Sequence, residues 1–260
     1  MPLRPGNTKL GLLIHQWSIP SGLRHICVGA SEICLMLCYA MRHHYRRDGV
    51  KDAMDRNYKV SLREDFVAVM LGWVRSLFVR VVRVHASGEF YSDEYVRKWI
   101  AIVEKSPRIT YFAYTRSWSD PEVYPALKEL ARLPNFVMWW SCDRATGAPP
   151  RNAGVRRAYL SIADDDVPRF RVDLVFRNNS KNVMKWMNGA LVCPPENGAT
   201  KTTCSLCQIC FKRDAVPRKE ENVRDTRRRN SGADKGANDG GAPVARSQPH
   251  HIRGVPVAGG

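Results

Sequence analysis

The sequence lacks any run of about 18 uncharged apolar residues, the length that a helix needs to cross a membrane. Its longest apolar region, residues 67–84, contains three arginines. The pattern of a secretory signal is also missing, because only two basic residues precede a short apolar run at 11–14 and no small-residue cleavage site follows it. We therefore expect no membrane partner and a cytoplasmic location, where the eight cysteines stay reduced.

Acidic residues are scarce. The chain has 25 Asp and Glu against 41 Lys and Arg, which gives a formal net charge of +16. The surplus is not confined to the C-terminus, because residues 211–260 carry only 11 of the basic residues and 6 of the acidic ones. Such a charge favours a polyanionic partner, nucleic acid first, bound through the basic surface and tail.

A repeat of fixed period is absent too, and composition divides the chain instead. Residues 1–57 are rich in Cys, His and Arg, residues 58–190 alternate between strand-like and helix-like segments, and residues 191–211 hold a second group of cysteines. Residues 212–260 include seven glycines after Asn230 and have no core-forming pattern. We predict that this last segment is a disordered basic tail.

The middle block predicts strands that alternate with helices. The expected strands are 79–85, 109–115, 136–142, 157–163 and 171–176. The expected helices are 62–78 with Ser61 as N-cap, 92–104, 121–133 and a short one at 183–189. This alternation predicts an α/β fold of parallel βα units. A closed eight-unit barrel usually needs about 250 residues and about 210 are ordered here, so we expect a partial (β/α) barrel.

Polar residues follow three of these strands. His85, Ser87 and Glu89 follow the first, Arg116 follows the second, and Asp143 and Arg144 follow the third. Because parallel α/β folds build their sites at the carboxyl ends of strands, these side chains are expected to meet at one edge of the sheet.

Three cysteines lie close together near the N-terminus: Cys27, Cys34 and Cys38. Three thiolates hold three irons of a [4Fe–4S] cluster and leave the fourth iron open to another ligand. Two alternatives remain: a zinc site completed by His25, His43 or His44, and three unrelated thiols that pack as small apolar groups.

A second group of four cysteines forms a stronger metal signal: Cys193, Cys204, Cys207 and Cys210. Two successive gaps of two residues let neighbouring sulfurs converge, and both zinc and a second iron–sulfur cluster accept four thiolates. Cys142 is left over at the end of a strand, and we interpret it as a packed core thiol.

Several long motifs resemble one known family. They are NTKLG (7–11), WSIPSG (17–22), CVGASEIC (27–34), CYA (38–40), VRVHASGEFYSDEYVRKW (82–99), YTRSW (114–118), SCDRATG (141–147), CPPENG (193–198) and TCSLCQIC (203–210). This set is similar to the gene-product-88-like proteins of actinobacteriophages, over roughly residues 6–211. The resemblance implies a phage protein that works in the host cytoplasm, and it implies no activity.

The N-terminal cysteine motif also resembles that of radical S-adenosylmethionine (SAM) enzymes, although its gaps of six and three residues differ from the usual three and two. The resemblance implies a [4Fe–4S] cluster and SAM, with Ser87, Gly88 and Glu89 in place of the turn that receives the SAM amino group. The same resemblance implies a catalytic role for Glu89. The strand-end positions of the other residues predict a catalytic proton donor in His85, and cofactor contacts to a ribose or a phosphate from Arg116, Asp143 and Arg144. A first-turn carboxylate of the next helix is the alternative for Glu89, and a core imidazole for His85.

The sequence thus supports two hypotheses from different classes. The first is a radical SAM-like enzyme that needs an electron donor and abstracts hydrogen from an unidentified substrate, such as nucleic acid or a modified nucleotide. The second is a non-catalytic, metal-stabilised protein that binds nucleic acid.

Overall fold

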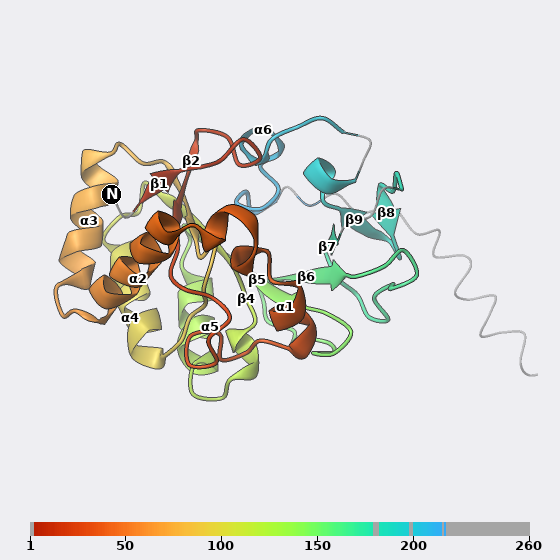
Figure 1. Ribbon diagram of the computed structural model, residues 1–260, viewed down its shortest axis with the longest axis horizontal. Helices are drawn as coiled ribbons and strands as arrows, with labels where there is room; N and C mark the ends of the chain where they lie inside the picture. The colour runs from red at the N-terminus through yellow and green to blue at the C-terminus, as the bar shows by residue number, and fades with distance from the viewer. Residues whose placement is uncertain (1–2, 179–181, 198–199, 215, 217–260) are drawn as a thin grey trace, which may run out of the picture. The chain divides into compact units, whose positions relative to one another are not determined.

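A computed structural model describes residues 3–178, 182–197, 200–214 and 216 (Figure 1). One sheet runs through the described part of the chain, in the order β1-β2-β3-β4-β5-β6-β7-β9-β8. Its strands are β1 (Arg4–Pro5), β2 (Ile14–Trp17), β3 (Val81–Val84), β4 (Thr110–Thr115), β5 (Phe136–Cys142), β6 (Arg156–Ser161), β7 (Leu174–Arg177), β8 (Trp186–Met187) and β9 (Ala190–Val192). The helices are α1 (Glu32–Leu37), α2 (Asp48–Leu62), α3 (Phe66–Ser76), α4 (Asp93–Glu104), α5 (Tyr124–Arg132) and α6 (Cys204–Cys207).

The sheet is mostly parallel. Every neighbouring pair from β2 to β9 is parallel, and the antiparallel strands β1 and β8 form the two edges. The predicted α/β class is therefore confirmed, as a mixed fold with a large open sheet. The barrel itself stays a prediction.

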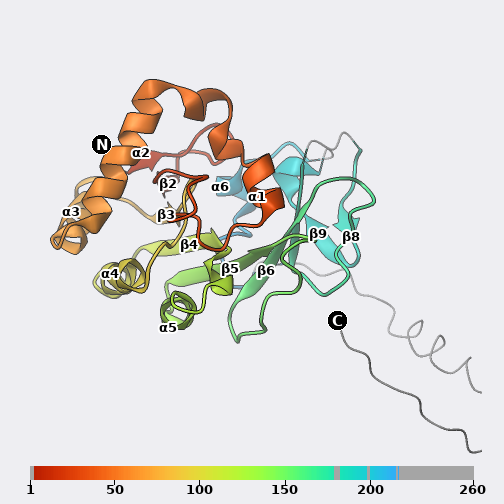
Figure 2. The ribbon, with the colours of Figure 1, turned by 60° about the horizontal axis from the view of Figure 1, so that its bottom comes forward.

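One face of the sheet is covered by helices. Figure 2 shows α3, α4 and α5 following one another along the same side of the strands. The buried core between these layers includes Trp17 of β2, Trp99 of α4 and Trp140 of β5. Helix α4 forms where the sequence predicts it, because its apolar residues recur at helical spacing and the Ser92 hydroxyl accepts a hydrogen bond from the Tyr95 amide at 3.2 Å.

The opposite face is covered by the C-terminal cysteine segment. Phe112 and Trp139 point to this side and pack with Ile209 and Phe211 in a second core cluster. The indole Nε1 of Trp139 donates a hydrogen bond to the carbonyl of Cys210 at 2.9 Å. The sheet is thus buried on both faces by different parts of the chain.

One predicted helix begins at the wrong residue and another is absent from the described residues. Residues 62–78 are not one helix, because α2 ends at Leu62 and α3 begins at Phe66. Ser61 is not an N-cap: it is buried in the last turn of α2, where its hydroxyl donates to the carbonyl of Tyr58 at 2.7 Å. Residues 183–189 contain β8 and not a helix, since Asn188 and Gly189 both have positive φ and turn the chain back into β9.

The regular alternation of strand and helix also stops after β5. Residues 143–155 and 162–173, which connect β5 to β6 and β6 to β7, contain no helix. These connections hold Pro149, Pro150 and Pro168 together with Gly147 and Gly154, whose φ values are 68° and 76°. Proline and left-handed glycine interrupt helices, which explains why the helix layer covers only the first half of the sheet.

The described residues up to 216 belong to a single compact unit. The boundaries predicted at 57, 190 and 211 stay predictions. Most of the predicted disordered tail, residues 217–260, lies outside the described residues. Within the part of the chain that the structure describes, no helix has the length and apolar character to span a membrane.

Candidate functional site

The loop after β2 carries the three N-terminal cysteines to the carboxyl ends of the parallel strands. The amide of Ile19 donates to the carbonyl of Ser87 at 3.1 Å, just beyond β3. Gly29 lies against the backbone beyond β4, where a Cβ on Gly29 would come within 2.0 Å of the Arg116 carbonyl oxygen. Ser31 donates to Oδ2 of Asp143 at 2.5 Å, beyond β5. The loop is therefore attached to three successive strand ends.

Cys27, Cys34 and Cys38 lie close enough to influence one another. Burial, the Glu89 carboxylate and the other two thiols together raise the pKa of Cys27 to about 12. Burial likewise raises the pKa of Cys34 to about 11, while the Arg116 guanidinium opposes the shift. The Glu89 carboxylate and the Arg116 guanidinium thus act on the pKa values of these thiols in opposite directions. All three are free thiols.

Glu89 is held at the strand edge by the residues that follow β4. Its Oε2 accepts hydrogen bonds from the hydroxyl of Thr115 at 2.5 Å and that of Ser117 at 3.0 Å. Its Oε1 accepts from the Arg116 amide at 3.3 Å. Burial raises the pKa of Glu89 despite these donors. The carboxylate is outside α4, which begins at Asp93, so the alternative of a first-turn residue does not describe it.

Arg116 and Asp143 form a buried ion pair beside the cysteine loop. The guanidinium Nη1 lies 2.7 Å from Oδ2, and the two side chains are 5% and 0% exposed. Oδ1 of Asp143 accepts from the amides of Ala145 and Thr146 at 2.8 and 3.0 Å. The predicted neighbour Arg144 is exposed and makes no hydrogen bond or ion pair within the described residues. The structure therefore joins Arg116 to Asp143 and leaves Arg144 outside this group.

His85 lies on the helix side of the sheet. Its φ of 62° turns the side chain toward α4, where Nε2 is 2.9 Å from the hydroxyl of Tyr95 and the ring packs edge-on to Phe90. Burial, with a smaller effect of Arg83, lowers the pKa of His85 to about 3. This placement fits the alternative of a neutral core imidazole.

The turn after β3 contains Ser87 and Gly88, which differ in how the structure accounts for them. Gly88 has a φ of 85°, and a Cβ there would lie 2.2 Å from Cγ1 of Ile19, so the glycine is required by the neighbouring loop. The hydroxyl of Ser87 is buried and has no hydrogen-bond partner within the described residues. A buried hydroxyl without a partner is costly.

The four C-terminal cysteines belong to the second core cluster, on the other side of the sheet. Cys193 follows β9, and Cys204 and Cys207 are the ends of α6. Burial raises the pKa of Cys210 to about 12, and the thiols of Cys204 and Cys207 contribute. Cys204 and Cys210 likewise raise the pKa of Cys193, after burial and Glu196. The left-handed turn at Gln208, with a φ of 60°, places Cys210 back beside α6.

The NTKLG motif fastens this cysteine group to the N-terminus. The amides of Cys204 and Ser205 donate to the carbonyls of Lys9 and Leu10, both at 2.9 Å. The ammonium of Lys9 forms an ion pair with Glu196. The Lys9 ammonium lowers the pKa values of the Cys193 and Cys204 thiols against the effect of burial.

Within the described residues, no group of three or more His, Cys, Asp or Glu side chains is arranged to hold a metal ion. Both metal sites therefore stay predictions. Cys142 is fully buried and its Sγ lies 3.3 Å from the carbonyl of Ala158, which agrees with its interpretation as a core thiol.

Some residues of this site were missed from the sequence. The hydroxyl of Ser31 makes two hydrogen bonds that local sequence does not predict together. It accepts from the Cys34 amide, which caps α1, and it donates to Asp143. Tyr39 donates to the carbonyl of Ala86 and ties the loop down after Cys38. The only available signal was the position of Ser31 directly before a helix-favouring segment, which is typical of an N-cap.

The fold and site define an α/β protein with a mostly parallel sheet and two groups of free thiols. Residues 2–174 match the family model described as Gene product 88, and the chain belongs to that family. It is similar to the Gene 88 protein of Mycobacterium phage L5, with 25% identity over 222 residues that cover 79% of this chain and 85% of the relative. The Gene 88 protein of Mycobacterium phage D29 is also 25% identical, over 79% of this chain and 86% of its own length.

No solved structure matches the chain. The predicted family is thus confirmed, and the names of the two relatives state a gene number without an activity. The resemblance to radical SAM enzymes gains no support from these matches and is carried only by the residues described above.

Proposed function

We propose that the protein is a radical SAM-like iron–sulfur enzyme of a phage, acting in the host cytoplasm on an unidentified substrate. Cys27, Cys34 and Cys38 would hold three irons of a [4Fe–4S] cluster, and the fourth iron would bind SAM. The observation that supports the proposal is the attachment of the cysteine loop to the carboxyl ends of neighbouring parallel strands, where Thr115 and Ser117 hold Glu89.

The strand order supports this placement. The parallel strands β2 to β7 and β9 are neighbours in chain order, with no reversal within the sheet. Doubly wound sheets reverse their order, whereas the walls of (β/α) barrels do not. The cysteine loop follows the first parallel strand, and Glu89 follows the second.

The residues present fit the group that the proposal requires. A cluster binds each thiolate at a different iron, so the sulfurs need to be near one another without converging on one ion. The hydroxyl of Ser87 lacks a partner in the described residues and is free to donate to or accept from a bound cofactor. Bound to a metal, the three thiols would be deprotonated, which removes the cost of their burial as isolated ionisable groups.

Glu89 would bind the ammonium group of SAM. Thr115, Ser117 and the Arg116 amide orient the carboxylate, and a carboxylate has further acceptor sites beyond the three that these donors use. A cation beside it would stabilise the ionised form against the effect of burial. Arg116 is already paired with Asp143, so we assign this pair to positioning the cysteine loop through Ser31.

A [4Fe–4S] cluster with SAM supplies one-electron reductive cleavage of SAM to methionine and a 5′-deoxyadenosyl radical, which takes a hydrogen atom from the substrate. The electron comes from an external donor, such as a low-potential flavodoxin or dithionite. The chain contributes orientation of SAM and exclusion of water at the buried strand edge. The four C-terminal thiols would hold a second iron–sulfur cluster or Zn²⁺.

The test is anaerobic reconstitution followed by iron, sulfide and zinc analysis. Cys27→Ala, Cys34→Ala and Cys38→Ala should each lose one cluster and its absorption at about 400 nm. Cys142→Ala is the matched control, because it removes a buried thiol that lies outside both groups. Retention of all iron by the triple variant would contradict the proposal.

A second measurement separates SAM chemistry from metal binding. Wild-type protein with dithionite and SAM should release 5′-deoxyadenosine, and Glu89→Gln should weaken SAM binding at unchanged iron content because it keeps the size and loses the charge. Protein with an intact cluster that neither binds SAM nor forms 5′-deoxyadenosine would overturn the enzyme assignment.

The formal net charge of +16 favours a second candidate, a metal-stabilised protein that binds nucleic acid without catalysis. Stoichiometric zinc with little iron or sulfide, together with salt-dependent binding of DNA or RNA, would support this candidate.

A further inference from the structure

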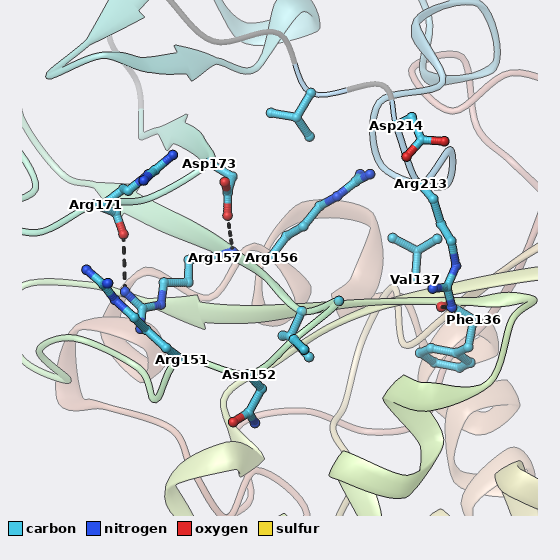
Figure 3. A pocket seen from close by; sticks show the side chains of 14 residues that line it. Phe136, Val137, Arg151, Asn152, Arg156, Arg157, Arg171, Asp173, Arg213 and Asp214 are labelled. Carbon is cyan, nitrogen blue, oxygen red and sulfur yellow. Dashed lines mark hydrogen bonds between the residues drawn. The ribbon is translucent and has the colours of Figure 1, made fainter. Parts of the chain in front are cut away.

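A cavity of about 750 Å³ lies at the amino ends of the strands, at the opposite edge of the sheet from the cysteine loop. Its walls include Phe136 and Val137 at the start of β5, Arg156 and Arg157 at the start of β6, and Asp173 just before β7 (Figure 3). Its residues take no part in either thiol group.

Arginine dominates this cavity. It is lined by five arginines, namely Arg151, Arg156, Arg157, Arg171 and Arg213. The acidic residues of the lining are Asp173 and Asp214. None of the five arginines takes part in the ion pairs found within the described residues. The lining therefore carries three more positive charges than negative ones, since five arginines stand against two aspartates.

Backbone carbonyls hold three of these guanidinium groups in place. Arg156 donates from Nη1 and Nη2 to the carbonyls of Ile209 and Lys212, at 2.9 and 2.7 Å. Nη2 of Arg157 donates to the carbonyl of Pro149 at 2.6 Å, and Nε of Arg213 to that of Pro134 at 3.1 Å. A carbonyl fixes a guanidinium without neutralising it, and each guanidinium has five N–H groups. The remaining donors are thus already oriented for an anion.

The arginines also repel one another. Burial lowers the pKa of Arg157, and the neighbouring charge of Arg151 lowers it further. An anion between them would relieve this repulsion.

The arrangement fits a chain of phosphates better than a single compact anion. Figure 3 shows Arg151, Arg157 and Arg171 on one side of the cavity and Arg213 on the other, so the charges do not converge on one point. Phe136 supplies the only aromatic ring of the lining and is 1% exposed, so the cavity offers no face on which a base could stack. The volume is that of a small-ligand pocket and does not admit a duplex.

We propose that this arginine cavity binds the sugar–phosphate backbone of a single nucleic-acid strand, with Arg151 and Arg171 as the exposed phosphate contacts. The inference rests on the second candidate function, nucleic-acid binding, and locates it at the amino ends of the strands. It is independent of cluster or SAM binding.

The test measures binding of the full-length chain to a fluorescein-labelled 12-nucleotide single strand by anisotropy, over a range of NaCl concentrations. The cavity variant carries Arg151→Ala and Arg171→Ala. The control carries Lys51→Ala and Arg56→Ala, which removes the same charge from two exposed positions of α2 that do not line the cavity.

The cavity variant should bind about tenfold more weakly at low salt, and the slope of log K against log salt should become shallower by about 1.4, for two lost phosphate contacts. The control should change affinity by less than about twofold. Equal losses in the two variants would overturn the cavity as the site while keeping nucleic-acid binding.

Two other outcomes would contradict the proposed ligand itself and not only its location. Absence of binding to any single strand at low ionic strength would remove both the cavity and the second candidate function. Competition by tripolyphosphate that matches the oligonucleotide at equal phosphate concentration would identify a site for compact polyanions instead of a strand.

Discussion

Asp143→Asn should destabilise the protein by about 3–5 kcal/mol, because it breaks a buried ion pair and leaves the Arg116 guanidinium without a counter-charge. The carboxylate is 0% exposed and lies 2.7 Å from Arg116. It also accepts from Ser31, Ala145 and Thr146, and an amide in its place presents a donor where an acceptor is needed.

The control is the same change at an exposed ion pair. Asp93 contacts Arg97 at 2.6 Å with 41% and 53% of the two side chains exposed, so Asp93→Asn should cost less than about 1 kcal/mol. Urea unfolding of each full-length variant, followed by tryptophan fluorescence, gives the free energy difference from the midpoint at constant slope. A cost for Asp143→Asn within 1 kcal/mol of the control would refute the reasoning from burial.

Ser31→Ala is a milder probe of the same anchor. It removes one hydrogen bond to Asp143 and the cap of α1, and should cost about 1–2 kcal/mol. If Ser31 attaches the cysteine loop to β5, the thiol of Cys34 should react faster with a disulfide reagent in this variant than in wild type. An unchanged rate would show that the loop is held without Ser31.

Two further predictions concern backbone strain and pH. Gly88→Ala should lower the free energy of unfolding by more than about 2 kcal/mol, because φ is 85° and the new Cβ meets Ile19. Gly72→Ala in α3 should raise it by about 0.5–1 kcal/mol, because nothing lies within 4 Å of the new Cβ. Thermal unfolding compares the two variants. Because the pKa of His85 falls from 6.5 to about 3 on folding, its neutral form stabilises the protein above pH 6.5, and about 2 kcal/mol should be lost between pH 6.5 and 5 as the unfolded chain takes up the proton. His85→Asn, which tolerates the positive φ, should lose this dependence, and an identical pH profile in the variant would contradict the assignment.

The part of the candidate site that lies directly after the strands was predictable from the sequence. The polar residues after β3, β4 and β5 identified Glu89, Arg116 and Asp143 as neighbours, because parallel strands bring their carboxyl ends to one edge. The side to which His85 points was not predictable, because alternation along a strand predicts the face that Arg83 occupies.

The positive φ of His85 breaks that alternation, and no local sequence pattern predicts this φ.

Contacts between distant segments were not predictable from local pattern. Ser31 and Asp143 are 112 residues apart, and the arginine cavity gathers residues 151–157, 171 and 213. The sequence shows an excess of basic residues, and only the fold shows which of them face one hollow. The start of α3 at Phe66 was missed because Ser61, three residues before Glu64, matches the pattern of a capping box, whereas Ser61 lies in the last turn of α2.

The fastening of residues 7–11 to α6 has a consequence for how the protein is made on the ribosome. The sheet face formed by Ile14, Phe112 and Trp139 packs against residues near Ile209 and Phe211, which are synthesised after all strands of the sheet. Until they emerge, a nascent chain exposes large side chains whose burial is worth about 2–3 kcal/mol each. A fragment restricted to the family match, residues 2–174, keeps this face bare. The closing of the molecule is therefore a late event of translation, when its first and last described segments join.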